Sequence, residues 1–252
     1  MAVKLDLKGS GTVDLELVDA TGKQVATATA KGSGTVTMNV ENPNKWSAET
    51  PYLYTLRASM QGSNEVIPVN VGFRKIELKG GQILVNGKAV LFKAADPNEL
   101  DPDGGYVVSP ERMLQDIQIM KQYNLNAVRT CHYPDNNLWY DLCDKYGILV
   151  WQDFMFACST YPMTAERLEN IRQEAIDNIV RLRNHPCIAI WCGNNENHTA
   201  WFNWGWMQKY EKLGVLEEMR KDDKELFHKL LPEVVKEYDP KTFYLCLLYT
   251  SP

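Results

Sequence analysis

The chain has 252 residues, of which 44% are hydrophobic and 23% are charged, so it contains enough apolar sequence for a globular core. Its 27 basic and 32 acidic side chains give a formal net charge of −5, which indicates no nucleic-acid partner and no membrane-surface partner. No apolar run approaches the roughly 18 residues of a membrane-spanning helix, and the first residues lack the apolar core of a signal peptide. Disordered, fibrous and membrane classes are therefore excluded, and the spacing of cysteines and histidines argues against a structural zinc site.

The first 80 residues alternate apolar and polar side chains with a period of two, the pattern of half-buried strands. Short runs of this kind recur at intervals of about 8–12 residues, so we expect an antiparallel β-sandwich domain over residues 1–79. The expected strands are 3–7, 13–18, 24–30, 35–40, 52–60 and 65–71.

After Gly80 and Gly81, short buried strands alternate with amphipathic helices. The sequence Ser109-Pro110 predicts a helix start, and Gly147 predicts a helix end. The expected strands are 89–95, 126–131, 148–154 and 188–192, with a fifth at 242–248. This alternation is typical of a parallel sheet, either doubly wound or part of a (β/α)₈ barrel. A complete barrel takes about 250 residues, so a barrel here would end near its fifth strand.

Polar side chains follow each of the first four strands of this second domain. Asn98 comes after the first, His132 after the second, Asp153 after the third, and Asn195 with Glu196 after the fourth. A single cluster of this kind is more often a cap. Because the carboxyl ends of parallel strands meet at one edge of a sheet, four successive clusters favour a functional pocket.

Glu196 is the sharpest candidate, since it follows a buried strand, a glycine and two amides. Desolvation beside Trp191 would raise the pKa of such a carboxyl and suit a general acid. The alternative is that Glu196 only caps the following segment, and the spacing alone does not decide between them.

Several segments resemble glycoside hydrolase family 2. Trp-Cys-Gly-Asn-Asn-Glu at 191–196, after Arg-Asn-His-Pro at 183–186, resembles the strand that carries the family's acid/base. Asn-Ala-Val-Arg-Thr-Cys-His-Tyr-Pro at 126–134 resembles the family's other hallmark. Residues 71–77 and 83–93 resemble the join between its second sandwich and its barrel.

The resemblance implies an immunoglobulin-like β-sandwich over residues 1–79, truncated at its N-terminus. It also implies the first four to five βα units of a TIM barrel over residues 80–252. Because the family's first sugar-binding-type domain is missing, we expect an internal fragment.

The activity that the resemblance implies is that of a retaining exo-β-glycosidase working with two glutamates, whose carboxyl groups lie roughly 5–5.5 Å apart. Glu196 matches the acid/base. Asn195 matches the amide that holds the sugar's 2-hydroxyl group, and His132 matches a substrate-pocket histidine of the galactosidase branch. The expected substrate-binding residues are Asn195, His132, Trp191, Asp153 and Asn98.

The nucleophilic glutamate of this family lies on the seventh barrel strand. The later glutamates of this chain all fall in helix-patterned sequence: Glu211, Glu217, Glu218, Glu225, Glu233 and Glu237. We therefore expect the nucleophile to be absent from this chain, and the fragment itself to be inactive.

Two branches of the family are mixed. Up to about residue 147 the chain resembles bacterial β-galactosidases, and from residue 148 it resembles β-mannosidases. An intermediate subfamily and a join of two genes both remain open, and residues 245–252 resemble translated adapter sequence. The galactosidase ligands of magnesium would fall at about Ala157 and Ser159, whose side chains cannot replace them. We expect no such metal site and no cofactor.

The expected partner is a carbohydrate with a terminal β-galactoside or β-mannoside, with no nucleic acid and no membrane. Two alternatives to an enzyme remain: a non-catalytic carbohydrate-binding protein on a decayed barrel, and an inactive fragment whose unpaired sheet edges promote aggregation.

Overall fold

The computed structural model describes residues 1–246 and divides into two compact units, Met1–Arg74 and Lys75–Pro252. The division lies slightly before the boundary expected at residue 79. Within residues 1–246, no helix combines the length and the apolar character needed to cross a bilayer.

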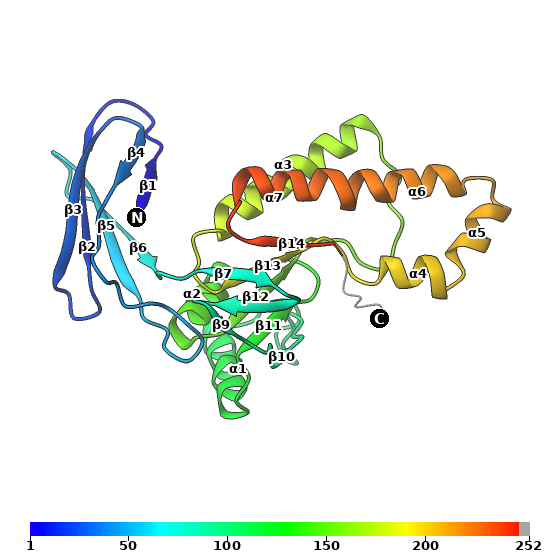
Figure 1. The fold of residues 1–252 in the computed structure, drawn as a ribbon, viewed down its shortest axis with the longest axis horizontal. Coiled ribbons are helices and arrows are strands. Elements are labelled where there is room, and N and C mark those ends of the chain that lie inside the picture. The colour runs from blue at the N-terminus through cyan, green and yellow to red at the C-terminus, as the bar shows by residue number, and fades with distance from the viewer. Residues whose placement is uncertain (247–252) are drawn as a thin grey trace. The chain divides into compact units, whose positions relative to one another are not determined.

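The first unit is an antiparallel sandwich (Figure 1). Its four-stranded sheet has the order β3 (Gln24–Lys31), β2 (Thr12–Val18), β5 (Tyr54–Met60) and β6 (Val66–Val71), and its second sheet pairs β1 (Ala2–Leu5) with β4 (Gly34–Thr37). Alternation along β2 buries Val13, Leu15 and Leu17 in the core, against partly buried side chains of β1 and β4. The immunoglobulin-like sandwich that the sequence predicted is confirmed.

A three-stranded antiparallel sheet opens the second unit, formed by β7 (Ile76–Lys79), β8 (Gln82–Val85) and β9 (Lys88–Ala89). The prediction of one strand over 89–95 was wrong. Asn86 and Gly87 both have positive φ, 53° and 81°, and this tight turn folds Lys88–Ala89 back onto β8. Only β10 (Ala94–Ala95) joins the parallel sheet.

The parallel sheet has the order β10, β11 (Ala127–Thr130), β12 (Leu149–Asp153), β13 (Ile188–Cys192) and β14 (Phe243–Leu245). Every neighbouring pair is parallel, and spatial order follows chain order, as in a (β/α)₈ barrel. The N-terminal part of a TIM barrel is thus confirmed. Leu245 lies in the segment that resembled adapter sequence. It belongs to the fifth strand, β14, and pairs there with Cys192 of β13. Residues 247–252 lie outside the described part of the chain.

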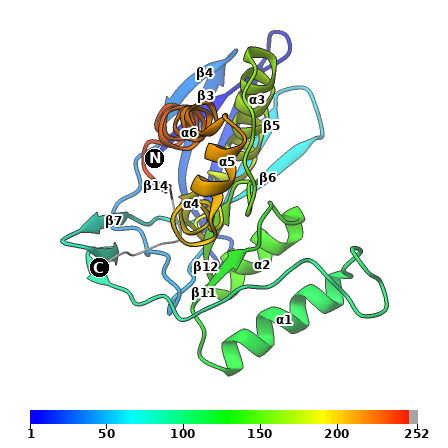
Figure 2. The same ribbon diagram turned by 90° about the vertical axis from the view of Figure 1, so that its right-hand side faces the viewer.

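Helices connect these strands: α1 (Pro110–Gln122), α2 (Asn137–Tyr146), α3 (Ala165–Leu182), α4 (Asn197–Asn203), α5 (Trp206–Lys212), α6 (Leu216–Lys224), the π-helix η1 (Glu225–Leu230) and α7 (Leu231–Tyr238). The hydroxyl of Ser109 caps α1, and Gly147 ends α2 in the left-handed conformation, as expected. The helices α6, η1 and α7 form one continuous rod that lies beside α3, with α4 and α5 at its far end (Figures 1 and 2).

Candidate active site

Arg129 and Asp153 form the centre of a polar cluster at the carboxyl ends of β11, β12 and β13. The Nε and Nη2 atoms of Arg129 donate to the Asp153 carboxylate at 3.1 and 2.7 Å. Both side chains are buried, with 5% and 0% exposed. Burial lowers the pKa of Arg129, but the hydrogen bond and charge of Asp153 outweigh it and raise that pKa overall. The pair is therefore a fixed ionic link between two strands.

His132 joins this pair at the open side of the cluster. Its Nδ1 lies 2.7 Å from the Oδ2 atom of Asp153, and its side chain is 28% exposed. Because an ionised carboxylate only accepts hydrogen bonds, Nδ1 carries a proton here and Nε2 remains for another partner. Asp153 thus orients His132, and the structure brings these two expected residues together in one cluster.

Arg129 also donates to the Oδ1 atom of Asn195, at 3.0 Å. This bond fixes which end of the amide faces the site: Nδ2 points to Oε2 of Glu196, at 3.2 Å. The thiol of Cys158 donates to the same oxygen, with Sγ at 3.5 Å. Four of the expected residues, Glu196, Asn195, His132 and Asp153, therefore lie in one connected network.

Glu196 occupies the residue before α4, yet its side chain makes no capping hydrogen bond. Its backbone is left-handed, with φ of 60°, a region that non-glycine residues rarely adopt, and the residue is exposed. Such conformations cluster at functional sites. The carboxyl is therefore available at the surface, and the interpretation of Glu196 as a simple cap does not fit this geometry.

Backbone hydrogen bonds join the loop after β12 to the loop after β13. The amide of Asn195 donates to the Phe156 carbonyl at 2.9 Å, and the amide of Cys158 donates to the Asn195 carbonyl at 3.0 Å. The side chain of Asn197 adds a bond to the Ser159 carbonyl at 3.0 Å. These bonds position Glu196 from both sides.

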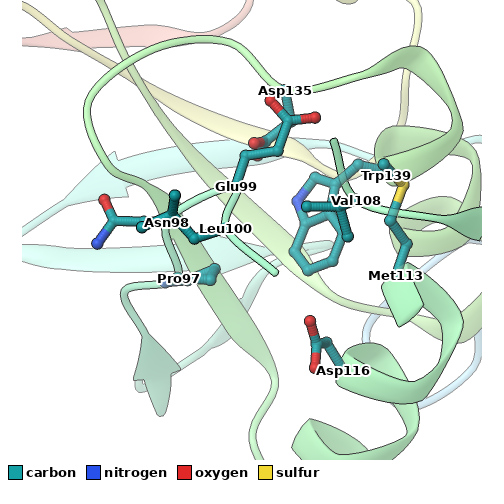
Figure 3. Close-up of a pocket in the computed structure, with 9 residues that line it drawn as sticks. All are labelled: Pro97, Asn98, Glu99, Leu100, Val108, Met113, Asp116, Asp135 and Trp139. Atoms are coloured by element: carbon teal, nitrogen blue, oxygen red, sulfur yellow. The ribbon is translucent and has the colours of Figure 1, made fainter. Parts of the chain in front are cut away.

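Two expected site residues lie elsewhere. Trp191 has no exposed surface: its indole donates to Asp239 at 3.0 Å and stacks on Phe154. Trp191 is therefore a core residue and not the exposed substrate-binding side chain that we expected, because a residue inside a strand buried on both faces packs in the core. Asn98 is exposed, and Figure 3 shows its amide pointing away from Asp135 and Trp139 in a separate pocket.

That pocket is lined by Glu99, Asp135, Trp139 and neighbours on α1 (Figure 3). Burial, reinforced by the negative charge of Glu99, raises the pKa of Asp135 to about 7. Within residues 1–246, neither carboxyl group forms a hydrogen bond with the cluster around Glu196.

Sequence reasoning assigned no role to Arg129 or Cys158. For Arg129 a signal existed, because a charged residue in a fully buried strand requires a buried partner. For Cys158 no signal existed, since only the joined loops bring its thiol to Glu196.

Within residues 1–246, one group has the composition of a metal site: Asp144, His185 and Cys187, whose ligand atoms lie within 4.8 Å of one another. Its carboxylate already accepts hydrogen bonds from the Cys187 amide at 2.9 Å and from Nδ1 of His185 at 2.7 Å. These bonds tie the end of α2 to the loop before β13, so the group is a structural network.

Comparisons with known proteins agree with this geometry. The family model "Glycosyl hydrolases family 2" matches residues 2–74, and "Glycosyl hydrolases family 2, TIM barrel domain" matches residues 76–221. A β-galactosidase of Halalkalibacterium halodurans is 40% identical over 206 residues, covering 73% of this chain and 20% of that protein. A β-galactosidase of Lactococcus lactis subsp. lactis is 40% identical over 184 residues, covering 66% of this chain and 18% of that protein.

Among solved structures, the β-D-mannosidase of Dictyoglomus thermophilum is similar with a TM-score of 0.77 and 28% identity, covering 98% of this chain and 32% of that one. A β-glucuronidase of Ruminococcus gnavus has a TM-score of 0.74 and 25% identity, covering 94% and 38%. The chain spans about a fifth of the length of the curated relatives it matches. With both of its units matched by models of one family, this chain belongs to glycoside hydrolase family 2.

Proposed function

We propose that this chain is part of a retaining exo-acting glycoside hydrolase in which Glu196 is the general acid/base. The observation that carries the proposal is the uncapped, exposed carboxyl of Glu196, joined through Asn195 to the Arg129–Asp153 pair at the carboxyl edge of the sheet. Catalytic groups of TIM barrels sit at this edge.

In the proposed first step, Glu196 donates its proton to the glycosidic oxygen while a second carboxylate attacks the anomeric carbon from the opposite face. Glu196, now ionised, then removes a proton from the water that releases the sugar. The carbonyl oxygen of Asn195 is occupied by Arg129, and its amide N–H groups donate to Glu196 and Cys158 in this structure, so a sugar hydroxyl would have to take over one of these N–H groups. Nε2 of His132 is a second polar atom for the sugar.

The second carboxylate is proposed to come from outside this chain. The later glutamates that the structure describes all lie on helices rather than at strand ends: Glu211 on α5, Glu217 and Glu218 on α6, Glu225 on η1, and Glu233 and Glu237 on α7. The 252-residue chain by itself is accordingly proposed to be inactive.

The proposed substrates are terminal β-D-galactosides or β-D-mannosides. The first is supported by the β-galactosidase relatives and the second by the structural likeness to a β-mannosidase.

The experiment compares wild type with Glu196→Gln in a polypeptide that carries this chain together with the rest of its barrel. Turnover is measured on aryl β-galactosides and aryl β-mannosides of differing leaving-group ability. We expect Glu196→Gln to lower turnover about 10²–10⁴-fold for poor leaving groups and much less for good ones, because good leaving groups need little protonation. Glu211→Gln, an exposed glutamate of α5, is the matched control.

Equal turnover of wild type and Glu196→Gln on poor leaving groups would remove Glu196 from the mechanism. Sugar binding without any hydrolysis by the wild-type polypeptide would instead indicate a non-catalytic carbohydrate-binding protein.

A further inference from the structure

The thiol of Cys158 contacts the carboxyl of Glu196 from a different loop. Its Sγ lies 3.5 Å from Oε2 of Glu196, and Nδ2 of Asn195 lies 3.5 Å from the same sulfur and 3.2 Å from the same oxygen. Two donors from two loops therefore converge on one carboxylate oxygen. Within residues 1–246, the other oxygen, Oε1, accepts no hydrogen bond.

The backbone holds both partners in a disfavoured conformation. Within residues 1–246, the non-glycine residues with positive φ are three asparagines, Cys158 at 48° and Glu196 at 60°. Asparagine tolerates this region, whereas cysteine and glutamate seldom occupy it. The hydrogen bond from the Cys158 amide to the Asn195 carbonyl joins Cys158 to the residue directly before Glu196.

We propose that Cys158 is a positioning residue for Glu196: its thiol donates a hydrogen bond to Oε2 and, with the Asn195 amide, holds the carboxyl so that Oε1 faces the substrate. The functional meaning of this contact rests on the proposed role of Glu196. The contact itself is independent of that role and is tested separately.

The electrostatics suit a neutral thiol donor. Cys158 is exposed, yet partial desolvation raises its pKa, and the hydrogen bond and charge of Glu196 raise that pKa further, against an opposing hydrogen bond from Asn195. Two further ionisable groups lie close by: the Tyr161 hydroxyl, whose pKa is raised in part by Cys158, and the Arg129 guanidinium, which donates to Asn195. Cys158 therefore remains protonated near neutral pH and keeps its hydrogen for Glu196.

A thiol is a weak donor. It can orient a carboxylate without stabilising the charged form as strongly as a hydroxyl or ammonium group would. A weak donor therefore suits Glu196 as a partner, because Glu196 must carry a proton in one step and be ionised in the next.

The test measures the pH dependence of Cys158 alkylation by iodoacetamide in this chain, with peptide mass spectrometry to separate the six cysteines. Only the thiolate reacts, so the rate rises through the midpoint of thiol ionisation. We expect a wild-type midpoint above that of an ordinary thiol. Glu196→Gln should lower it by on the order of half to one pH unit, because the neutral amide no longer opposes a second negative charge about 3.5 Å away. Glu169→Gln, exposed on α3, is the matched control and should leave the midpoint unchanged.

The buried thiols of Cys143 and Cys187 report folding in the same experiment, since they react only if the chain opens. If Glu196→Gln exposes them, Glu196→Asp is measured instead, because it keeps the charge and withdraws it by one methylene group; its midpoint should fall between those of wild type and an ordinary thiol. A midpoint that does not move in the folded variant overturns the proposal. That result would leave the hydrolytic role of Glu196 untouched, and a failed hydrolysis test would leave the thiol shift in place.

Discussion

Arg129 and Asp153 lie on adjacent strands, and the same guanidinium that binds Asp153 also reaches Asn195, 66 residues away in the chain. Removing two charges from water is costly, and the cost is offset only when the remaining donors and acceptors are satisfied. Here His132 and Asn195 satisfy them. Hydrogen bonds therefore connect the strand ends of the sheet to the candidate acid/base Glu196 through Asn195.

Removing both halves of this pair should cost less stability than the two single removals added together. Asp153→Asn leaves the buried Arg129 charge without its counter-ion, and we expect the free energy of unfolding to fall by about 3–5 kcal/mol. In Arg129→Met/Asp153→Asn both charges are absent, so the loss should be smaller than the sum of the two single losses. Urea denaturation followed by circular dichroism measures each value. Strict additivity of the single variants would contradict the coupling.

Asp135 should make stability depend on pH. Its pKa of about 7 in the folded chain exceeds the unfolded value of about 4, so the folded state binds the proton more tightly. Stability from this group is therefore complete below about pH 4 and is lost as the pH rises toward 7. As the pH is raised from 5 to 7.5, we therefore expect the free energy of unfolding of Asp135→Asn to increase relative to that of wild type by on the order of 2 kcal/mol.

The control for this pH series is Asp103→Asn, which changes an exposed aspartate. Parallel stability curves for wild type and Asp135→Asn across this range would show that Asp135 ionises as an ordinary surface carboxyl.

Local sequence chemistry predicted the elements of the fold because each signal acts within a few residues. The period-two alternation of β2, the Ser109 cap and the Gly147 stop all depend on neighbours in the chain. The split of 89–95 was missed for a related reason: Asn86 and Gly87 are a hairpin turn only because β8 precedes them and Lys88 can fold back.

The candidate site was predictable only in part. Strand-end position brought Glu196, Asn195, Asp153 and His132 together correctly, because it follows from parallel topology. Trp191 was misjudged because its side chain direction depends on packing against Phe154. The Cys158 contact depends on hydrogen bonds between two loops, which no local pattern encodes.

The hydrogen bond from Cys158 should be visible in kinetics of the longer polypeptide. We expect Cys158→Ala to lower kcat about fivefold, equivalent to a loss of about 1 kcal/mol for one hydrogen bond from a weak donor, with KM nearly unchanged. Cys158→Ser should retain more activity, because its hydroxyl also donates. Equal losses for alanine and serine would show that the sulfur acts by packing and not as a donor.

Asp144 should stabilise the fold more through the hydrogen bonds that it accepts than through its negative charge. Its carboxylate is fully buried and accepts from the Cys187 amide and from His185. Asp144→Ala removes the acceptor of both hydrogen bonds, and we expect a loss of about 2–6 kcal/mol, since removing one partner of a buried hydrogen bond costs about 1–3 kcal/mol. Asp144→Asn keeps one carbonyl for the Cys187 amide and should lose less. Equal destabilisation by both variants, measured by urea denaturation, would contradict this explanation.

Gly193 should be essential for seating β14. Its amide donates to the Leu245 carbonyl at 2.9 Å, and an added Cβ would overlap the Tyr244 hydroxyl oxygen and lie 3.0 Å from the Cys246 carbonyl. Tyr244 cannot easily yield, because its hydroxyl donates to the Phe227 carbonyl at 2.8 Å.

We therefore expect Gly193→Ala to loosen β14 and to speed hydrogen exchange of its amides by at least about tenfold. Gly11→Ala is the control, because its Cβ would meet only the flexible end of the Met60 side chain. Unchanged protection of the β14 amides in Gly193→Ala would mean that the strand can move aside without cost. The close approach of residue 193 to Tyr244 would then not require glycine.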